Sequence, residues 1–327
     1  MQALLEVEDL CVQFSARDDK VVRAADGVGF HIHEGESLGL LGESGSGKSV
    51  TALSLLRLLP PGGRIVEGRI RFRGEDLSLV PDRRMQQIRG SQIAMIFQEP
   101  GIALCPVVSV GSQIADVIAT HRGWPKDRCR KEAEQLLSVV GLPEPKSFFP
   151  AFPHQLSGGQ LQRVVIALAL AGQPKLLIAD EPTTALDMKL QHEVLMLVQE
   201  LRKSMRMSVL WITHDPDVLR ALADRIVVMY AGRVVEVGSA EQILHRPQHP
   251  YTVSLLRCAP QTRPTGAALR KQPLPVIAGN VPNLASLPME CRFAPRCPER
   301  MDICTEREPG LIQMESGGLV RCFKYGG

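Results

Sequence analysis

The feature that most constrains this chain is a run of eight residues that fits the phosphate-loop pattern G-x-x-x-x-G-K-[S/T] without a mismatch. Its members are Gly42, Glu43, Ser44, Gly45, Ser46, Gly47, Lys48 and Ser49. The run follows an apolar strand predicted at Ser37–Leu41 and opens an apolar helix predicted at Val50–Leu59, which is the context that the motif needs. The glycines let backbone N–H groups turn inward around phosphate oxygens, and the helix start adds its positive end. We therefore expect Lys48 to reach the β- and γ-phosphates of a nucleotide and the Ser49 hydroxyl to bind Mg²⁺; a merely flexible glycine loop is the weaker alternative.

The middle of the chain alternates short apolar runs with helical periodicity, which indicates an α/β fold with a parallel sheet. Residues 176–179 and 209–212 are predicted to be buried strands, and residues 190–201 carry apolar side chains at helical spacing. A second helical pattern, at 133–140, is expected to stop at Gly141.

Two stretches in the first quarter of the chain favour β-structure of another kind. Residues 4–14 alternate between apolar and polar side chains, and residues 64–73 do the same around a turn predicted at Gly68. We expect these pieces to form a small antiparallel layer against the parallel core.

An acidic pair, Asp180 and Glu181, ends the apolar run 176–179. A carboxylate at the end of a buried strand lies beside the phosphate loop in such a sheet, so Asp180 suits Mg²⁺, directly or through water. The next residue points elsewhere, so Glu181 is expected to take a proton from an attacking water molecule. Without the phosphate loop, the pair would indicate only a polar strand end that leads into a turn.

A second glycine-bearing motif precedes the apolar helix predicted at 161–171 and has the form of another anion cradle at a helix start. Its residues are Ser157, Gly158, Gly159 and Gln160, preceded by Leu156. This stretch resembles the signature motif of the ABC ATPases. In that family, the signature of one subunit caps the γ-phosphate bound to the phosphate loop of a second subunit. The resemblance implies that these four residues, together with Asp187, act on a partner's nucleotide.

Other positions match the same family. Gln98, after the apolar strand predicted at Ile93–Phe97, resembles the loop glutamine that senses the γ-phosphate, binds Mg²⁺ and contacts the transport subunit. The segment 185–187 (Ala-Leu-Asp) is similar to the one that crosses the dimer interface. His214 resembles the switch histidine, and Phe14 is in the place of the aromatic residue that stacks on adenine, although a Phe at a strand end is more often part of a core.

From Arg246 onward prolines recur at short intervals, which indicates an extended linker and a separate tail module. Four of the eight cysteines lie after residue 290: Cys291, Cys297, Cys304 and Cys322. The tail resembles the C-terminal region of the ATP-binding subunits of bacterial dipeptide, oligopeptide and nickel importers, in which four cysteines can hold a 4Fe–4S cluster. Zinc, or four unligated thiols, are the alternatives, although zinc sites more often begin with closely spaced cysteine pairs.

The expected organisation is a P-loop ABC ATPase domain at 1–245, with a helical subdomain at about 98–172, and a linker with a four-cysteine module at 246–327. The net charge of +3 does not favour nucleic acid as a partner. No apolar run approaches the ~20 residues needed to span a bilayer. The chain is therefore not expected to cross a membrane, and the resemblance implies that it lies at the cytoplasmic face of the inner membrane as a peripheral subunit.

The resemblance implies several partners: a second ATPase subunit (a paralogue in preference to an identical chain), two transmembrane permease subunits and, indirectly, an extracytoplasmic substrate-binding protein. It implies ATP-driven import of dipeptides or oligopeptides, with nickel or metal-chelate import as the alternative within the same family. A soluble ABC ATPase that works on nucleic acid or ribosomes is a further alternative. One departure from the family pattern is Cys105, where an asparagine is usual; it lies just after Gln98, in the region that the resemblance places against the transport subunit.

Overall fold

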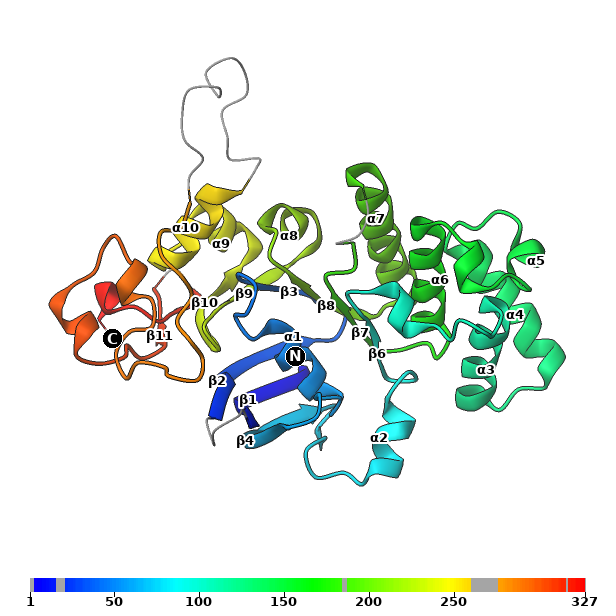
Figure 1. Ribbon diagram of the computed structural model, residues 1–327, viewed down its shortest axis with the longest axis horizontal. Coiled ribbons are helices and arrows are strands. Elements are labelled where there is room, and N and C mark those ends of the chain that lie inside the picture. Colours follow the sequence, from blue (N-terminus) through cyan, green and yellow to red (C-terminus); the bar gives the residue numbers. More distant parts are fainter. Residues whose placement is uncertain (1–2, 16–20, 184–186, 260–275, 316, 327) are drawn as a thin grey trace, which may run out of the picture.

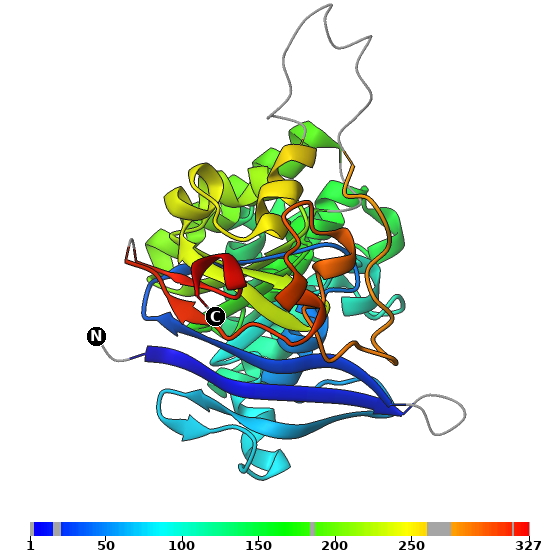
Figure 2. The same cartoon turned by 90° about the vertical axis from the view of Figure 1, so that its left-hand side faces the viewer.

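The computed structural model describes residues 3–15, 21–183, 187–259, 276–315 and 317–326, and the strands of these residues form two sheets. The smaller sheet holds, in order, β2 (Val21–His33), β1 (Ala3–Ser15), β4 (Gly63–Phe72) and β5 (Glu75–Asp76). The larger sheet holds, in order, β11 (Ile312–Gln313), β12 (Leu319–Val320), β10 (Arg233–Ser239), β9 (Arg225–Tyr230), β3 (Ser37–Leu41), β8 (Ser208–Thr213), β7 (Leu176–Asp180) and β6 (Ile93–Ile96). The expected α/β architecture with an antiparallel layer is confirmed, and Figure 2 shows the blue and cyan strands of that layer below the larger sheet.

The centre of the larger sheet is parallel and buried. β3 runs parallel to β8 and β9, and β7 runs parallel to β6 and β8. Every residue of β3, β7 and β8 is buried, because helices and the smaller sheet cover both faces, and this explains their continuous apolar sequences. Parallel strands place their carboxyl ends at one edge of the sheet, so the loops that follow β3, β6, β7 and β8 meet there.

The helix after the phosphate loop, α1, spans Lys48–Leu55 and is shorter than the helix predicted to reach Leu59. The helix cannot reach Leu59, because Pro60 follows this residue and the residue before a proline disfavours helical backbone. Arg57 adopts a left-handed conformation, with φ of 51°, and its guanidinium donates a hydrogen bond of 2.6 Å to the carbonyl of Val80. The chain then turns directly into the antiparallel layer.

The turn predicted at Gly68 is wrong, because this residue lies inside β4. The pairing of β1 with β4 shifts register between Glu8 and Cys11, which marks a bulge opposite Gly68. Gly68 has φ of 95°, and a Cβ atom there would lie 2.5 Å from the carbonyl oxygen of Asp9. The glycine therefore serves a close approach of two strands.

The helical part lies at one end of the molecule (Figure 1). Its elements are η2 (Pro100–Ala103), α3 (Val110–Arg122), α4 (Lys126–Val139), α5 (Pro145–Phe148), η3 (Pro153–Gln155) and α6 (Gly158–Leu170), and α2 (Asp82–Ile88) precedes them. The helix predicted at 133–140 is confirmed in α4, and Gly141 follows it with φ of 81°. In the part of the chain that the structure describes, no helix has the length and apolar character needed to cross a bilayer.

The region after β10 is less extended than expected. Two helices follow β10: α9 (Ala240–His245) and α10 (Pro250–Cys258), and the latter replaces the first part of the predicted extended linker. Pro250 is compatible with a helix because it occupies the first turn, and His249 caps that turn. Tyr251 is fully buried, with its ring 4.6 Å from that of Tyr230 and 5.5 Å from that of Phe293.

The C-terminal residues continue the larger sheet, because β12 pairs with β10 in antiparallel fashion. The described part of this region also contains the short 3₁₀ helices η6 (Ala294–Arg296), η7 (Asp302–Thr305) and η8 (Phe323–Tyr325). In Figure 1 they lie at the end of the molecule opposite the helical part. The boundary placed at residue 245 stays a prediction, but both sides of it share one hydrophobic core.

A buried cluster of charges joins the C-terminal region to the smaller sheet. The guanidinium of Arg292 donates to the carboxylate of Asp26 and, at 2.6 Å, to the carbonyl of Ala231. Arg233 also donates to Asp26, at 3.1 Å, and forms an ion pair of 3.3 Å with Glu308. Burial alone would raise the pKa of Asp26, but the hydrogen bond from Arg292 and the charge of Arg233 hold the pKa below its ordinary value.

Candidate nucleotide-binding site

The loop between β3 and α1 has the geometry that backbone binding of an anion requires. Gly47 is the N-cap of α1, with φ of 100°, and a Cβ atom there would lie 2.3 Å from the carbonyl oxygen of Ala24. A Cβ atom at Gly42 would lie 2.3 Å from the carbonyl oxygen of Met229. Both positions therefore need glycine for a close backbone approach, and the loop leads into the positive end of a helix.

The ammonium group of Lys48 lies inside this loop. Its Nζ atom donates to the carbonyl oxygens of Gly42 at 2.8 Å and Glu43 at 2.9 Å. Burial lowers the pKa of Lys48, and the neighbouring carboxylates of Glu181 and Asp180 act in the opposite direction. A buried cation on a flexible stem, held by two carbonyl oxygens and, at 3.4 Å, by the Ser46 hydroxyl, can exchange these bonds for phosphate oxygens.

A hydroxyl and a carboxylate face each other between α1 and β7. Ser49 Oγ donates a hydrogen bond of 3.1 Å to Asp180 Oδ1. Burial raises the pKa of Asp180, and the hydrogen bond from Ser49 opposes this rise. Hydroxyl and carboxylate oxygens are the ligands that Mg²⁺ prefers, so the two residues fit the metal predicted from the sequence.

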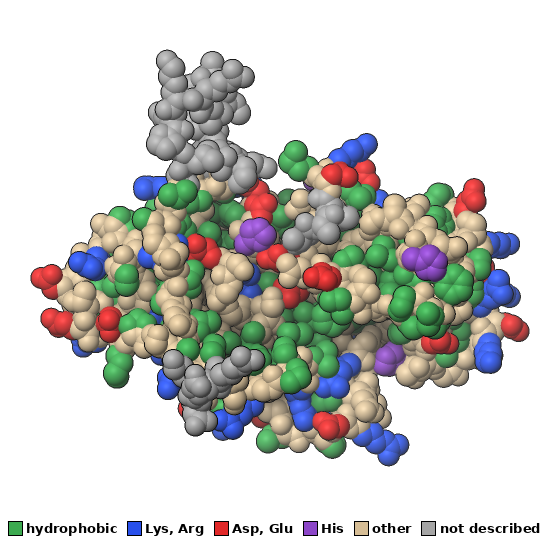
Figure 3. Space-filling view, viewed as in Figure 1, with side chains coloured by type: hydrophobic (Ala, Val, Ile, Leu, Met, Phe, Trp, Pro, Cys, Tyr) green, Lys and Arg blue, Asp and Glu red, His purple; other side chains and the backbone are tan. Residues whose placement is uncertain are grey.

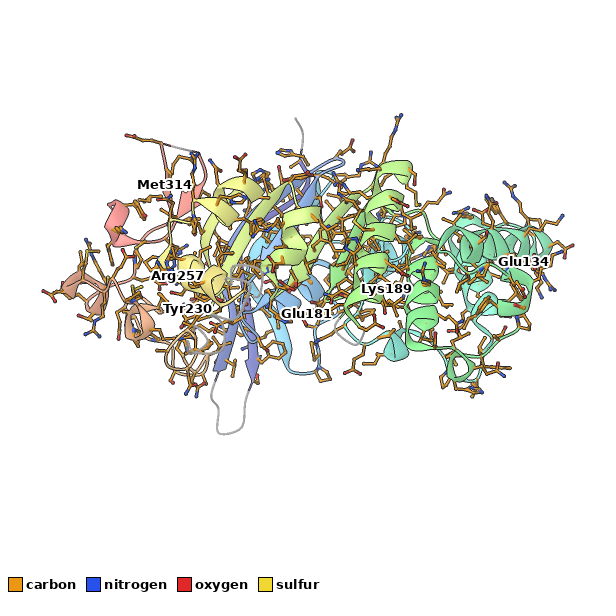
Figure 4. All side chains as sticks on the ribbon, turned by 90° about the horizontal axis from the view of Figure 1, so that it is seen from above. Glu134, Glu181, Lys189, Tyr230, Arg257 and Met314 are labelled. Carbon is orange, nitrogen blue, oxygen red and sulfur yellow. The ribbon has the colours of Figure 1, made fainter. Side chains whose placement is uncertain are left out.

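Three strand ends bring Glu181, His214 and Gln98 together. Glu181 Oε1 lies 2.8 Å from His214 Nδ1, and Glu181 Oε2 accepts a hydrogen bond of 3.2 Å from Gln98 Nε2. Glu181 has φ of 44°, which turns its side chain away from the course of β7, and its N–H donates to the carbonyl of Ile212 at 2.9 Å. Figure 4 shows Glu181 near the middle of the molecule. The carboxylate is therefore held at two oxygens by residues from two neighbouring strands.

A cavity of about 800 Å³ joins these groups. The phosphate loop, Gln98, Glu181 and His214 line one part of it. Another part is lined mainly by apolar side chains, which are Ala24, Leu255, Cys258, Val276, Ile277, Val281 and Leu284. This lining was not predicted from the sequence, because its members come from β2, α10 and the proline-rich segment that follows. The only available signal was the short apolar run Val276-Ile277 among the prolines.

Phe14 is not part of the cavity lining. It lies near the end of β1 and packs against the hydrophobic core of the smaller sheet, with its ring edge close to Gly63. Its assignment to the adenine ring stays a prediction.

The signature motif forms the N-terminus of α6. Ser157 Oγ accepts a hydrogen bond from the Gln160 N–H at 3.4 Å, and Gln160 Oε1 accepts one from the Ser157 N–H at 2.9 Å. Gly159 is buried, and a Cβ atom there would lie 2.4 Å from the side chain of Leu190. The cavity of their own chain is not lined by any of the four signature residues, Ser157, Gly158, Gly159 and Gln160.

Asp187 caps α7 (Met188–Met205) by accepting hydrogen bonds from the N–H groups of Lys189 and Leu190. Ala185 and Leu186, the other residues predicted to lie at a dimer interface, are outside the described residues. A role of Asp187 in trans stays a prediction, as it does for the signature residues.

The four C-terminal cysteines gather in one place. The Cys291 N–H donates to the carbonyl of Cys304 at 3.2 Å. Burial raises the pKa of Cys291 to about 11, and the charges of Cys304 and Cys297 add to this rise. Burial likewise raises the pKa of Cys297 and Cys322, and each is also raised by a neighbouring cysteine. Among the described residues, however, no group of three or more His, Cys, Asp or Glu side chains is arranged to hold a metal ion.

Comparisons with known proteins agree with this geometry. Residues 25–184 match the family described as ABC transporter, and residues 235–304 match the one described as oligopeptide/dipeptide transporter, C-terminal region. The chain is 45% identical to the oligopeptide transport ATP-binding protein AppD of Bacillus subtilis, over 99% of this chain and 98% of the relative. It is 43% identical to the oligopeptide transport ATP-binding protein OppD of Salmonella typhimurium, over 98% and 93% of the two chains.

A solved structure shows the same fold. The dimeric ATP-binding cassette MJ0796, bound to ADP and phosphate, superposes with a TM-score of 0.65 at 29% identity. It covers 72% of this chain and 98% of its own.

Proposed function

Since the chain belongs to the ABC transporter family of ATP-binding proteins that carry an oligopeptide/dipeptide transporter C-terminal region, we propose that it hydrolyses ATP to power the import of dipeptides and oligopeptides. The observation that carries the proposal is one cavity lined by the phosphate loop, Gln98, Glu181 and His214. The relatives' names refer to oligopeptide and dipeptide transport, which supports peptides as the substrate class.

Hydrolysis needs a water molecule to lose a proton as it attacks the γ-phosphate. Glu181 is the base, because its carboxylate is held at both oxygens by His214 and Gln98 and borders the cavity. Lys48 exchanges its bonds to loop carbonyls for bonds to the β- and γ-phosphates.

Ser49, Asp180 and Gln98 are the residues that would hold Mg²⁺. When bound, the ion neutralises charge that develops on the phosphate oxygens. The Ser49 hydroxyl and the Asp180 carboxylate already face each other at 3.1 Å. The amide oxygen of Gln98 is the third group in this proposal.

The site is shared between two ATPase subunits in our proposal. Ser157, Gly158, Gly159 and Gln160 form a capped helix start that lies outside the cavity of its own chain. A helix N-terminus with a glycine pair is suited to a phosphate brought by another subunit. The similar cassette MJ0796 is described as dimeric. We take the partner to be a paralogue in preference to an identical chain, and Asp187 to lie at the same interface.

The loop after Gln98 is proposed to dock on a transmembrane permease subunit. Ile102 and Val107 expose apolar side chains there, although the loop is well held: Gln113 bonds to both the N–H and the carbonyl of Cys105, at 2.8 and 2.9 Å. Exposed apolar groups on a fixed loop suit a protein partner. The full assembly would contain two permease subunits and receive substrate from an extracytoplasmic binding protein, with this chain at the cytoplasmic face of the inner membrane.

Nucleic acid is not part of this proposal. On the face drawn in Figure 3, basic and acidic side chains are interspersed, in keeping with the small net charge. Proteins that bind the phosphate backbone of a nucleic acid usually carry clustered lysine and arginine residues on the binding face.

Uptake measurements separate peptide import from nickel import, the second candidate within the family. Deleting the gene should abolish uptake of a labelled dipeptide, and the wild-type gene should restore it where Glu181→Gln does not. Lost nickel uptake with intact peptide uptake would assign the chain to metal import. Unchanged uptake of both would contradict the proposed substrate class.

We propose in addition that the four C-terminal cysteines hold a 4Fe–4S cluster. Cys291, Cys297 and Cys322 each have a pKa that is raised by at least one neighbouring cysteine, which supports the proposal. Binding a cluster would require the four thiols to converge, since the described residues hold no group of three or more side chains arranged for a metal ion. Iron and acid-labile sulfide should be found in anaerobically purified protein and be lost when Cys297 and Cys304 are replaced by serine. Absence of both elements from the wild-type protein would refute the cluster.

A further inference from the structure

The guanidinium group of Arg296 connects the C-terminal region to the phosphate loop. Its side chain is only 4% exposed. Nη1 donates to Glu43 Oε2 at 2.8 Å and Nη2 donates to Glu43 Oε1 at 3.0 Å, which is a two-point pairing of a guanidinium with a carboxylate. Glu43 is the second residue of the phosphate loop, so the loop is fixed from outside by an arginine more than 250 residues away.

Glu43 is held at its backbone as well. Its N–H donates to the hydroxyl oxygen of Tyr251 at 2.8 Å, and its carbonyl oxygen accepts the hydrogen bond from Lys48. The ring of Tyr230 lies beside the guanidinium of Arg296, 5.7 Å from the ring centre to Cζ. A single loop residue is thus linked to the phosphate-binding lysine on one side and to α10 and the C-terminal region on the other.

The same arginine also holds the segment 276–284. Arg296 Nε donates to the carbonyl of Ala278 at 3.0 Å, and Nη2 donates to the carbonyl of Ile277 at 3.3 Å. At the other end of the segment, the carbonyl of Leu284 accepts a hydrogen bond of 3.1 Å from the Arg23 N–H on β2. The segment is therefore anchored at both ends beside the phosphate loop.

The apolar side chains of this segment face the nucleotide cavity. Val276, Ile277, Val281 and Leu284 all line it, together with Leu255 of α10. The phosphate loop provides polar donors for phosphates, whereas these residues provide the surface that a flat, weakly hydrated group needs. ATP has both kinds of group, and its base and ribose are the parts that the phosphate loop does not bind.

We propose that the segment 276–284 is the wall on which the base and ribose of ATP pack, and that Arg296 is the positioning residue that holds this wall against the phosphate loop. The proposal rests on the ATPase function proposed above and assigns the C-terminal region a direct part in the nucleotide site. The wall contributes contact area only to ligands that carry a nucleoside.

Calorimetric titration of the full chain with Mg²⁺–ATP and with Mg²⁺–tripolyphosphate, which lacks base and ribose, tests the wall. Ile277→Ser should weaken ATP binding about tenfold and leave tripolyphosphate binding within twofold, since it removes apolar contact area alone. Val276→Ser should act in the same direction without a risk to folding, because Val276 is 79% exposed. Met289→Ser is the matched control, because Met289 is 89% exposed and outside the cavity lining.

Arg296→Gln tests the positioning role. It should weaken ATP binding more than tripolyphosphate binding, because it releases the wall as well as Glu43. Arg296→Lys, which keeps the charge but not the two-point pairing, should restore only part of the difference. These ratios of two affinities do not respond to a general loss of folded protein.

Three results would overturn the inference. Unchanged ATP affinity in both Ile277→Ser and Val276→Ser would remove the wall from the site. Equal losses for ATP and tripolyphosphate in Arg296→Gln would confine Arg296 to the phosphate loop. Failure of the wild-type chain to bind either ligand, with Lys48→Ala indistinguishable from it, would refute the ATPase proposal itself.

Discussion

Replacing Glu181 by glutamine tests the catalytic assignment most directly. The variant keeps the shape of the side chain, and its amide group can still accept from Gln98 and donate to His214, so the local fold should persist. It removes the group that accepts a proton. A general base contributes about 100- to 10,000-fold to the rate, so the barrier should rise by about 3–5 kcal/mol.

ATP binding should survive the same change or become tighter. The charge of Glu181 helps to raise the pKa of Asp180, so its removal relieves repulsion between two carboxylates where Mg²⁺ would bind. The opposing effect is on Lys48: removing the Glu181 charge takes away one carboxylate that stabilises the charged ammonium group, which donates to loop carbonyls in this structure and is proposed to bind phosphates. Because these two changes have opposite signs, we expect the dissociation constant for Mg²⁺–ATP to change by less than about threefold.

Steady-state phosphate release by the chain assembled with its transport partners measures the rate, and calorimetry measures the affinity. Glu200→Gln is the matched control, because Glu200 is an exposed carboxylate on α7 and outside the cavity lining. A Glu181→Gln turnover within threefold of the wild type would refute the assignment of Glu181 as the base. A parallel collapse of ATP binding would show that the carboxylate serves binding and not proton transfer.

Other perturbations address the remaining features of the structure. Lys48→Ala should weaken ATP binding by about 1.5–3 kcal/mol, measured by calorimetry, because it removes charged hydrogen bonds to phosphates. Ser49→Ala should raise the Mg²⁺ concentration needed for half-maximal hydrolysis, since one proposed oxygen ligand is lost. Arg292→Ala should lower the free energy of unfolding in urea by about 1.5–3 kcal/mol, because the buried carboxylate of Asp26 loses one charged hydrogen bond and keeps those from Arg233. The pKa of Asp26 is held below its ordinary value, so the stability that this carboxylate contributes is present at neutral pH and is lost as the pH falls below about 4. Urea unfolding at pH 7 and at pH 3 measures this loss. The free energy of unfolding should fall less between the two pH values in Asp26→Asn than in the wild type.

Much of the nucleotide site was predictable from the sequence because its residues occupy fixed places relative to local elements. The phosphate loop joins a strand to a helix, and Asp180 and His214 end buried strands, so neighbouring strands bring them to one edge of the sheet. The predicted helix after the phosphate loop was too long, because Pro60 disfavours helical backbone at Leu59, the residue before it. A turn was predicted at Gly68, whereas the residue lies in β4 opposite a bulge of β1; a bulge depends on the partner strand, which the local sequence does not show.

The apolar wall was beyond the reach of sequence reasoning. Prolines between 247 and 288 indicate an extended linker, and no local pattern tells where such a segment lies. Its position depends on Arg296, whose guanidinium bonds at once to Glu43 and to the carbonyls of Ile277 and Ala278. These hydrogen bonds join residues that are far apart in the sequence, so no local pattern indicates them.

The sequence alone determined the family, the parallel core and the groups proposed to act on phosphates, because these depend on short-range spacing of glycine, lysine and carboxylates within strand–loop–helix units. Only the tertiary structure decided that the C-terminal region belongs to the nucleotide site. The physical reason is that a buried ion pair and a packed aromatic cluster form between distant segments, and their energies depend on burial and distance, which local sequence does not encode.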